Sequence, residues 1–195
     1  MTKIAFAALL ATLPLSARAA TLTSDPAHST AGFAVKHMML TTVRGEFDKF
    51  TSTLDWNDAD PTKSSVTVDI DASSIDTHQE GRDKHVKSPD FLDTAKFPTI
   101  TFKSTKIEKG GDGYKVTGDL TFHGVTKPIT LDVQTDGKPR KTPQGAMVYG
   151  AAATGKIKRS DFGVSWNKNL DGGGVLISDD VALEFNLEYG VPKAK

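Results

Sequence analysis

The chain has 195 residues, of which 37% are hydrophobic and 25% charged, so a single domain of a soluble globular protein is the expected organisation. Basic and acidic residues balance at 24 each, which argues against a general nucleic-acid binder. Cysteine is absent, which excludes thiol nucleophiles, cysteine-ligated zinc, iron–sulfur clusters and disulfides.

The N-terminus has the pattern of a secretory signal peptide. Lys3 supplies a positive start, residues 4–13 form a short apolar stretch, and the Ala-Arg-Ala at 17–19 fits a signal-peptidase site. We expect residues 1–19 to be a signal peptide cleaved after Ala19, and the mature protein to be periplasmic. The mature chain, 20–195, retains 22 basic and 24 acidic residues, a net charge near −2.

In the mature chain, apolar residues alternate with polar ones, which is typical of strands with one buried face. The segments in chain order, with the residues expected to face inward, are 29–35 (Phe33, Val35), 65–73 (Val66, Val68, Ile70), 99–104 (Ile100, Phe102), 114–122 (Tyr114, Val116, Gly118, Leu120, Phe122), 128–133 (Ile129, Leu131, Val133), 146–157 (Met147, Tyr149, Ala151, Ala153) and 181–189 (Val181, Leu183, Phe185, Leu187, Tyr189).

Turn signals between these segments indicate antiparallel neighbours. Hairpin connections are expected at 110–113 and 135–139, and a tight corner at 123–128. The charged stretch 80–93 lacks alternation and predicts a short helix near 80–87, followed by a second turn opened by Ser88-Pro89. Roughly eight strands at this spacing fit a sandwich or a barrel.

A barrel would leave no sheet edge exposed, and we expect an all-β, antiparallel, roughly eight-stranded barrel with one or two short helices. Such a barrel is filled by its own side chains or holds one small ligand. The inward residues Ala151, Ala153 and Gly155 favour a hollow, unless a large neighbour such as Trp166 fills the space.

No metal or catalytic site stands out. None of the five histidines has a partner at the spacing of neighbouring metal ligands on a strand or helix. His37 would end an inward apolar column and hydrogen-bond the following turn, in which Met38 or Met39 could plug the barrel end.

Other polar motifs give equally weak signals. The stretch 55–61 fails the calcium-loop pattern, 170–175 lacks the ending of a phosphate loop, and no G-x-S-x-G elbow is present. In the basic stretch 156–163, Arg159 either contacts an anionic head group at the barrel rim or is a solvent-exposed strand end paired with Asp161.

Several stretches together resemble the YceI family of exported bacterial lipid-binding proteins. They span nearly the whole mature chain in order: 25–37 (DPAHS, GF, VKH), 43–47 (VRGEF), 82–98 (RDKH, DFLD, FP), 118–128 (GDLT, HGVTKP) and 159–163 (R, DFG). The resemblance implies a lipocalin-like barrel at 20–195, whose apolar interior takes a polyisoprenoid or other long-chain lipid, without catalysis and without a cofactor.

The resemblance supplies no set of binding residues, so we choose candidates from the alternation. The apolar cavity candidates are Phe33, Val35, Val68, Ile70, Phe102, Leu120, Phe122, Leu131, Leu183 and Phe185, with Phe91, Phe162 and Trp166 as walls near the opening. The polar rim candidates are His37, Arg82, His85 and Arg159.

Three functions remain open at this point. The first is a non-catalytic lipid carrier or sequestering protein. The second is an enzyme on a buried apolar substrate, with His37 or His85 as base. The third is a self-filled barrel that serves as a protein-interaction module. The carrier is favoured by the resemblance, and neither stable membrane insertion nor nucleic-acid binding is expected. The sequence is compatible with a monomer or a homodimer.

Overall fold

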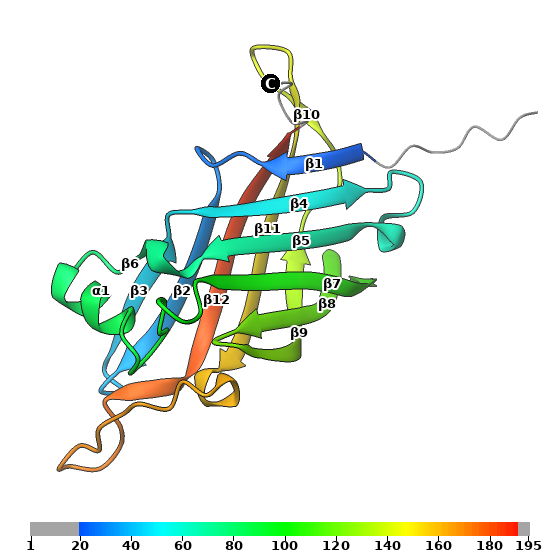
Figure 1. The fold of residues 1–195 in the computed structure, drawn as a ribbon. Coiled ribbons are helices and arrows are strands. Elements are labelled where there is room, and N and C mark those ends of the chain that lie inside the picture. Colours follow the sequence, from blue (N-terminus) through cyan, green and yellow to red (C-terminus); the bar gives the residue numbers. More distant parts are fainter. Residues whose placement is uncertain (1–19, 191–195) are drawn as a thin grey trace, which may run out of the picture.

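The computed structural model describes residues 20–190, and the predicted signal peptide at 1–19 lies outside this range. The described chain is a single antiparallel barrel with one α-helix against it (Figure 1), which confirms the expected fold class. The strands are β1 (Ala20–Ser24), β2 (Thr30–His37), β3 (Thr41–Phe47), β4 (Phe50–Trp56), β5 (Ser65–Asp71), β6 (Ile75–Asp76), β7 (Thr99–Gly110), β8 (Gly113–Phe122), β9 (Val125–Gln134), β10 (Arg140–Lys141), β11 (Met147–Lys158) and β12 (Ile177–Gly190). Short 3-10 turns are η1 (Pro61–Lys63), η2 (Ala72–Ser74) and η3 (Arg159–Phe162).

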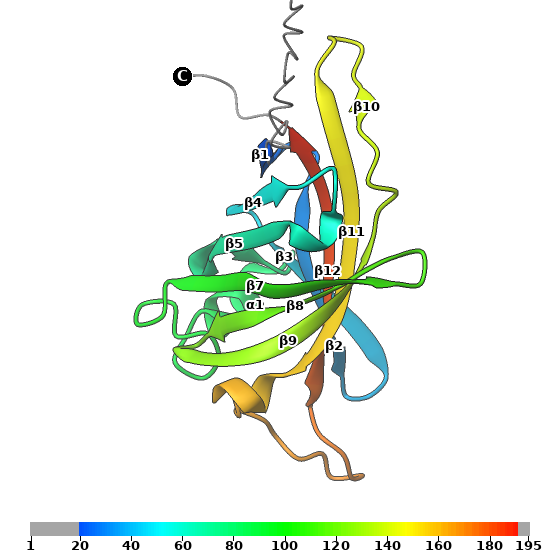
Figure 2. The same cartoon turned by 90° about the vertical axis from the view of Figure 1, so that its right-hand side faces the viewer.

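The sheet closes because β11 and β12 pair along almost their full length, from Val148 opposite Gly190 to Lys158 opposite Asp180. Figure 2 shows these two strands running together along the barrel. β1 and β2 pair with successive parts of β12, and their partners β4 and β3 follow the same bend. β1 and β2 together therefore act as one bent strand, and β3 and β4 together act as another. Eight strand positions surround the interior.

Two glycines provide space for inward-facing aromatic rings. A Cβ at Gly118 on β8 would lie 2.5 Å from the Phe102 ring, and one at Gly45 on β3 would lie 2.6 Å from the Phe33 ring. Because contacts this short do not occur between real atoms, any side chain at Gly118 or Gly45 would displace the ring. Both glycines therefore fix where large side chains point into the barrel.

The connections largely follow the turn signals. Gly110 and Gly113 close the β7–β8 hairpin, and His123 and Gly124 turn with positive φ between β8 and β9. The hairpin expected at 135–139 is wrong. The chain there continues to β10 and reverses at 142–146, because β10 pairs with the start of β11. The predicted helix is confirmed as α1 (Glu80–Val86).

A buried polar cluster lies where β1, β4 and β12 meet. The Tyr189 hydroxyl and the Ser52 hydroxyl are 2.6 Å apart, and the Ser52 amide donates to the Ser24 hydroxyl at 2.9 Å. All three side chains are buried, so each hydrogen bond replaces a lost contact with water. Burial raises the pKa of Tyr189 to about 12.

We expect this tyrosine to make folding sensitive to alkaline pH. Its pKa is higher in the folded state than the ordinary 10.0, so its stabilising contribution is complete below pH 10 and is lost as pH rises toward about 12. At about 1.36 kcal/mol per pKa unit, the loss is on the order of a few kcal/mol. Urea unfolding at pH 8 to 12 measures it. Tyr189→Phe should be less stable at pH 8, because Ser52 loses its partner, but less sensitive to alkali; an identical pH profile would contradict the assignment.

Candidate functional site

Two apolar cavities lie inside the barrel. The large cavity has a volume of about 390 Å³ and the small cavity about 120 Å³. Their walls share five side chains from four strands: Ile70, Ile100, Leu120, Leu183 and Phe185. The large cavity falls in the range of roughly 300–1,000 Å³ that is usual for small-molecule sites. The interior is therefore hollow on both sides of these five shared side chains, which we call the waist.

The structure places twelve of the thirteen apolar candidates on the cavity walls. Val68, Phe102 and Leu131 line the small cavity; Phe33, Val35, Phe91, Phe122 and Trp166 line the large one; Ile70, Leu120, Leu183 and Phe185 line both. Phe162 differs, because it is 1% exposed and packs behind Phe122, with ring centroids 5.5 Å apart. It supports the wall without lining it. Ligand contact by any of these residues stays a prediction.

The small residues of β11 have two different roles. Ala151 and Ala153 line the small cavity, so they do leave space. At Gly155, an added Cβ would lie 2.6 Å from Leu131, so Leu131 rather than Trp166 occupies the space there. The hollow and filled interpretations of this run are thus each right for part of it.

The large cavity opens beside α1. Arg82 and His85 on this helix are exposed and also line the cavity, so the cavity reaches the surface there. The His85 ring meets Phe91 and Trp166 edge-on, with both centroid distances 5.0 Å, and its Nε2 lies 2.9 Å from Asp90. These three rings form an amphipathic wall at the opening, in which the imidazole and the indole N–H of Trp166 are the polar groups.

Thr77 anchors α1 to the barrel. The Arg82 guanidinium donates to the Thr77 hydroxyl and carbonyl, at 2.8 and 2.6 Å. The Thr77 hydroxyl and amide donate in turn to Asp83, and the hydroxyl bond holds the pKa of that carboxyl below its usual value. Arg82 is therefore occupied in positioning the helix beside the opening.

Arg159 departs from one of the two expectations for it, the solvent-exposed strand end, while contact with a head group stays a prediction. Arg159 is 5% exposed, and its guanidinium donates to the carbonyls of Ser178, Val164 and Trp166 at 3.1, 2.9 and 2.9 Å. It is neither a solvent-exposed strand end nor a partner of Asp161. It lines the large cavity, but its donors hold the backbone that carries Trp166. Burial lowers the pKa of the guanidinium.

His37 lines the large cavity at the end of β2. Its carbonyl accepts from the Leu40 amide at 3.0 Å, so it holds the following turn through its backbone. Within residues 20–190 its ring makes no hydrogen bond, contrary to the expectation from sequence. Met38 and Met39 do not plug the barrel, because they are 40% and 59% exposed.

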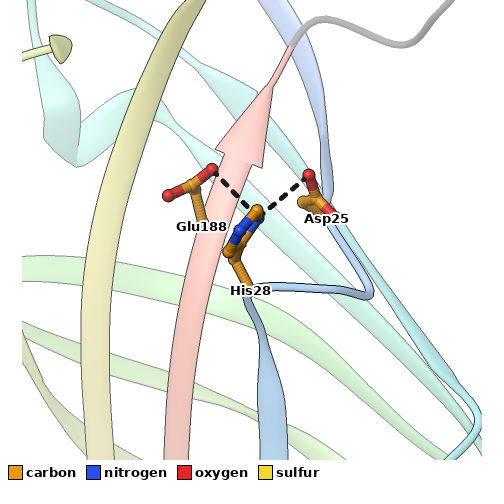
Figure 3. Close-up of side chains that lie close together, drawn as sticks. All are labelled: Asp25, His28 and Glu188. Carbon is orange, nitrogen blue, oxygen red and sulfur yellow. Dashed lines mark ion pairs between the residues drawn. The ribbon is translucent and has the colours of Figure 1, made fainter. Parts of the chain in front are cut away.

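One titratable cluster joins residues far apart in sequence. Asp25, His28 and Glu188 place one oxygen or nitrogen each within 4.8 Å of one another (Figure 3). The His28 Nδ1 lies 3.4 Å from Asp25 and 3.7 Å from Glu188. The imidazole is 64% exposed, and these ion pairs account for the arrangement, which ties the β1–β2 connection to β12.

Sequence reasoning missed the far end of the small cavity. Trp56 and Tyr149 line it with ring centroids 5.9 Å apart, and the Trp56 ring packs within 4 Å of where a Gly137 Cβ would lie. Trp56 is the last residue of β4. Because the polar residue Ser52 interrupts the apolar alternation of this strand, the sequence contains little indication that Trp56 points inward. Tyr149 was expected inward.

The site as a whole suits an extended apolar ligand. Its lining offers few polar groups, and most of those are bonded within the protein. Within residues 20–190, no helix has the length and apolar character needed to cross a membrane. A closed eight-stranded barrel around an apolar cavity is the architecture of lipocalin-like ligand-binding proteins.

The family follows from comparison with known proteins. The model of the YceI-like domain matches residues 22–189, and the chain belongs to this family. A UPF0312 protein of Staphylococcus aureus is 37% identical over 169 residues, which cover 87% of this chain and 96% of the relative.

Solved structures agree with the family assignment. BcnA of Burkholderia cenocepacia superposes with a TM-score of 0.72 at 28% identity, covering 85% of this chain and 98% of BcnA. The YCEI protein of Campylobacter jejuni gives 0.69 at 31%, covering 81% and 90%. A polyisoprenoid-binding domain of Saccharophagus degradans gives 0.59 at 18%, covering 89% and 99%, which shows a shared fold.

Proposed function

We propose that this protein is an exported, non-catalytic carrier or sequestering protein, which holds a polyisoprenoid or similar long-chain amphiphile in its barrel. The observation that carries the proposal is the pair of apolar cavities on one waist, because a long flexible tail can occupy both. The Saccharophagus degradans domain, described as polyisoprenoid-binding, has the same fold and supports this ligand class.

The polar groups at the cavity favour binding over catalysis. Among the described residues, Thr77, Arg82 and Arg159 use their donors within the protein. His85 is bonded to Asp90 at the opening, while the ring of His37 has no partner within residues 20–190 to orient it. An acid–base mechanism needs a positioned pair near the reacting atom, so we assign these side chains to structure and to the rim.

Native mass spectrometry of protein from its own exported compartment tests this proposal. We expect a stoichiometric long-chain prenyl or acyl compound, and a mature chain that begins at Ala20. A bare chain that refuses such compounds on re-addition would instead indicate a protein-interaction module.

Binding should depend strongly on tail length and weakly on the head group. Each buried methylene contributes about 0.8 kcal/mol, so removing one five-carbon unit from a fitting tail should cost about 4 kcal/mol and weaken binding by roughly several hundredfold. Competition with prenyl alcohols of increasing length measures this. Equal affinity across the series would contradict a hollow barrel that takes the tail.

A further inference from the structure

An apolar turn projects from the barrel between β2 and β3. Met38, Met39 and Leu40 are 40%, 59% and 77% exposed. Among residues 20–190, the only other exposed large hydrophobic side chain is Met147, which stands alone at the start of β11. Three consecutive exposed side chains of this kind form a patch, whereas a single one needs no explanation.

The backbone of this turn favours other residues. Met38 and Met39 have φ of 51° and 60°, and the Leu40 amide donates to the His37 carbonyl across them. Hairpin turns with positive φ at both central positions strongly prefer Asn-Gly. Methionine is therefore conformationally unfavourable here, and folding gains nothing from exposing it. A contact with another molecule would account for the presence of methionine at these two positions.

The turn lies next to the wall of the large cavity. The Met38 amide donates to the Leu176 carbonyl at 2.8 Å, and both Leu176 and His37 line that cavity. The turn and the 168–176 loop project from the same end of the barrel in both views (Figures 1 and 2). A surface that covers the turn would therefore lie close to the large cavity.

The flanking charges suit an anionic surface. Lys36 is exposed and precedes His37 in the chain. Lys168 is also exposed, and its backbone carbonyl accepts a hydrogen bond from the Leu176 amide at 2.9 Å. Within the described chain, neither lysine forms an ion pair. Asp171 is the one acidic residue of the 168–176 loop and partly offsets them.

We propose that Met38–Leu40, flanked by Lys36 and Lys168, docks on an anionic lipid bilayer and places the cavity opening at the membrane surface. Apolar side chains would enter the headgroup boundary while the lysines meet lipid phosphates. A long-chain lipid could then move between bilayer and barrel without crossing water. This inference rests on the proposed lipid-binding function, and it adds the surface from which the lipid is exchanged.

Vesicle flotation of the mature protein tests the proposal. We expect binding to vesicles of phosphatidylcholine with phosphatidylglycerol, and weaker binding to phosphatidylcholine alone. The triple variant Met38→Asn, Met39→Gly and Leu40→Ser keeps a favourable turn and removes the patch, so it should fold and bind vesicles at least about tenfold more weakly. Met147→Ser removes a comparably exposed methionine elsewhere and should bind as the original protein does.

Affinity for a short, water-soluble prenyl alcohol is measured in parallel without vesicles. The proposal expects this affinity to be equal in the original protein and the triple variant, which separates docking from the cavity itself. Failure of the original protein to float with either vesicle would overturn it, as would equal losses in the triple variant and Met147→Ser. The proposal would also be overturned if the original protein were a dimer that does not bind vesicles and the triple variant were a monomer. The patch would then contact a second copy of the chain.

Discussion

Arg159→Met is expected to lower the free energy of unfolding by about 3 kcal/mol, as buried carbonyls that lose their donors cost about 1–3 kcal/mol each and the apolar side chain offsets part of this. The guanidinium joins η3 to Val164, Trp166 and the start of β12. Methionine retains the apolar stem but supplies no donor. The change should therefore also release Trp166 from its position at the opening.

Urea unfolding measures the stability change, and Trp fluorescence reports on the opening. Lys156→Met is the matched control, because Lys156 is a basic residue near the end of the preceding strand β11, and its only ion pair within residues 20–190, with Asp180, is exposed. Its loss should cost less than about 1 kcal/mol. Equal effects of the two substitutions would show that Arg159 has no special structural role.

Much of the barrel could be predicted because its inward positions carry large apolar residues. The segment 181–189 alternates at every position but Ala182, and it became most of the strand that closes the barrel. The helix at 80–86 could be placed because its charged residues break the alternation. In both cases the signal is local to the segment.

β3 and β4 were not identified from the sequence, because their inward positions depend on distant partners. Gly45 occupies an inward position of β3 only because the Phe33 ring covers it, and Ser52 of β4 is fully buried only because Tyr189 satisfies its hydroxyl. Neither side chain predicts burial by itself. The partner that makes each of them favourable lies on another strand.

Arg159 was misplaced for a different reason. Its basic neighbours Lys156 and Lys158 suggested a solvent-exposed cluster, yet Ile157 and Arg159 share the buried side of the alternation. Continuing the two-residue period through the charged stretch would have placed Arg159 inward. The three carbonyls that make this burial favourable come from an irregular segment and from the start of β12, and a sequence pattern does not reveal them.

The waist between the cavities gives the prediction with the largest effect on binding. Leu183 on β12 lines both cavities with Ile70, Ile100 and Leu120. Leu183→Trp would fill the waist and confine a tail to the large cavity. If about five carbons lose their burial at about 0.8 kcal/mol each, the loss is about 4 kcal/mol, and affinity for a long prenyl ligand should fall by roughly several hundredfold. A short ligand that fits in the large cavity should bind almost as before.

The control must separate a blocked waist from a damaged fold. Overpacking costs about 1–3 kcal/mol, so unfolding of the variant is measured alongside binding. Asn186→Trp adds the same indole to the exposed outer face of the same strand, and it should leave both affinities unchanged. A loss for long ligands alone means that the tail passes the waist into the small cavity. If Leu183→Trp weakened short and long ligands equally, the tail would end in the large cavity, and the small cavity would belong to the packing of the barrel.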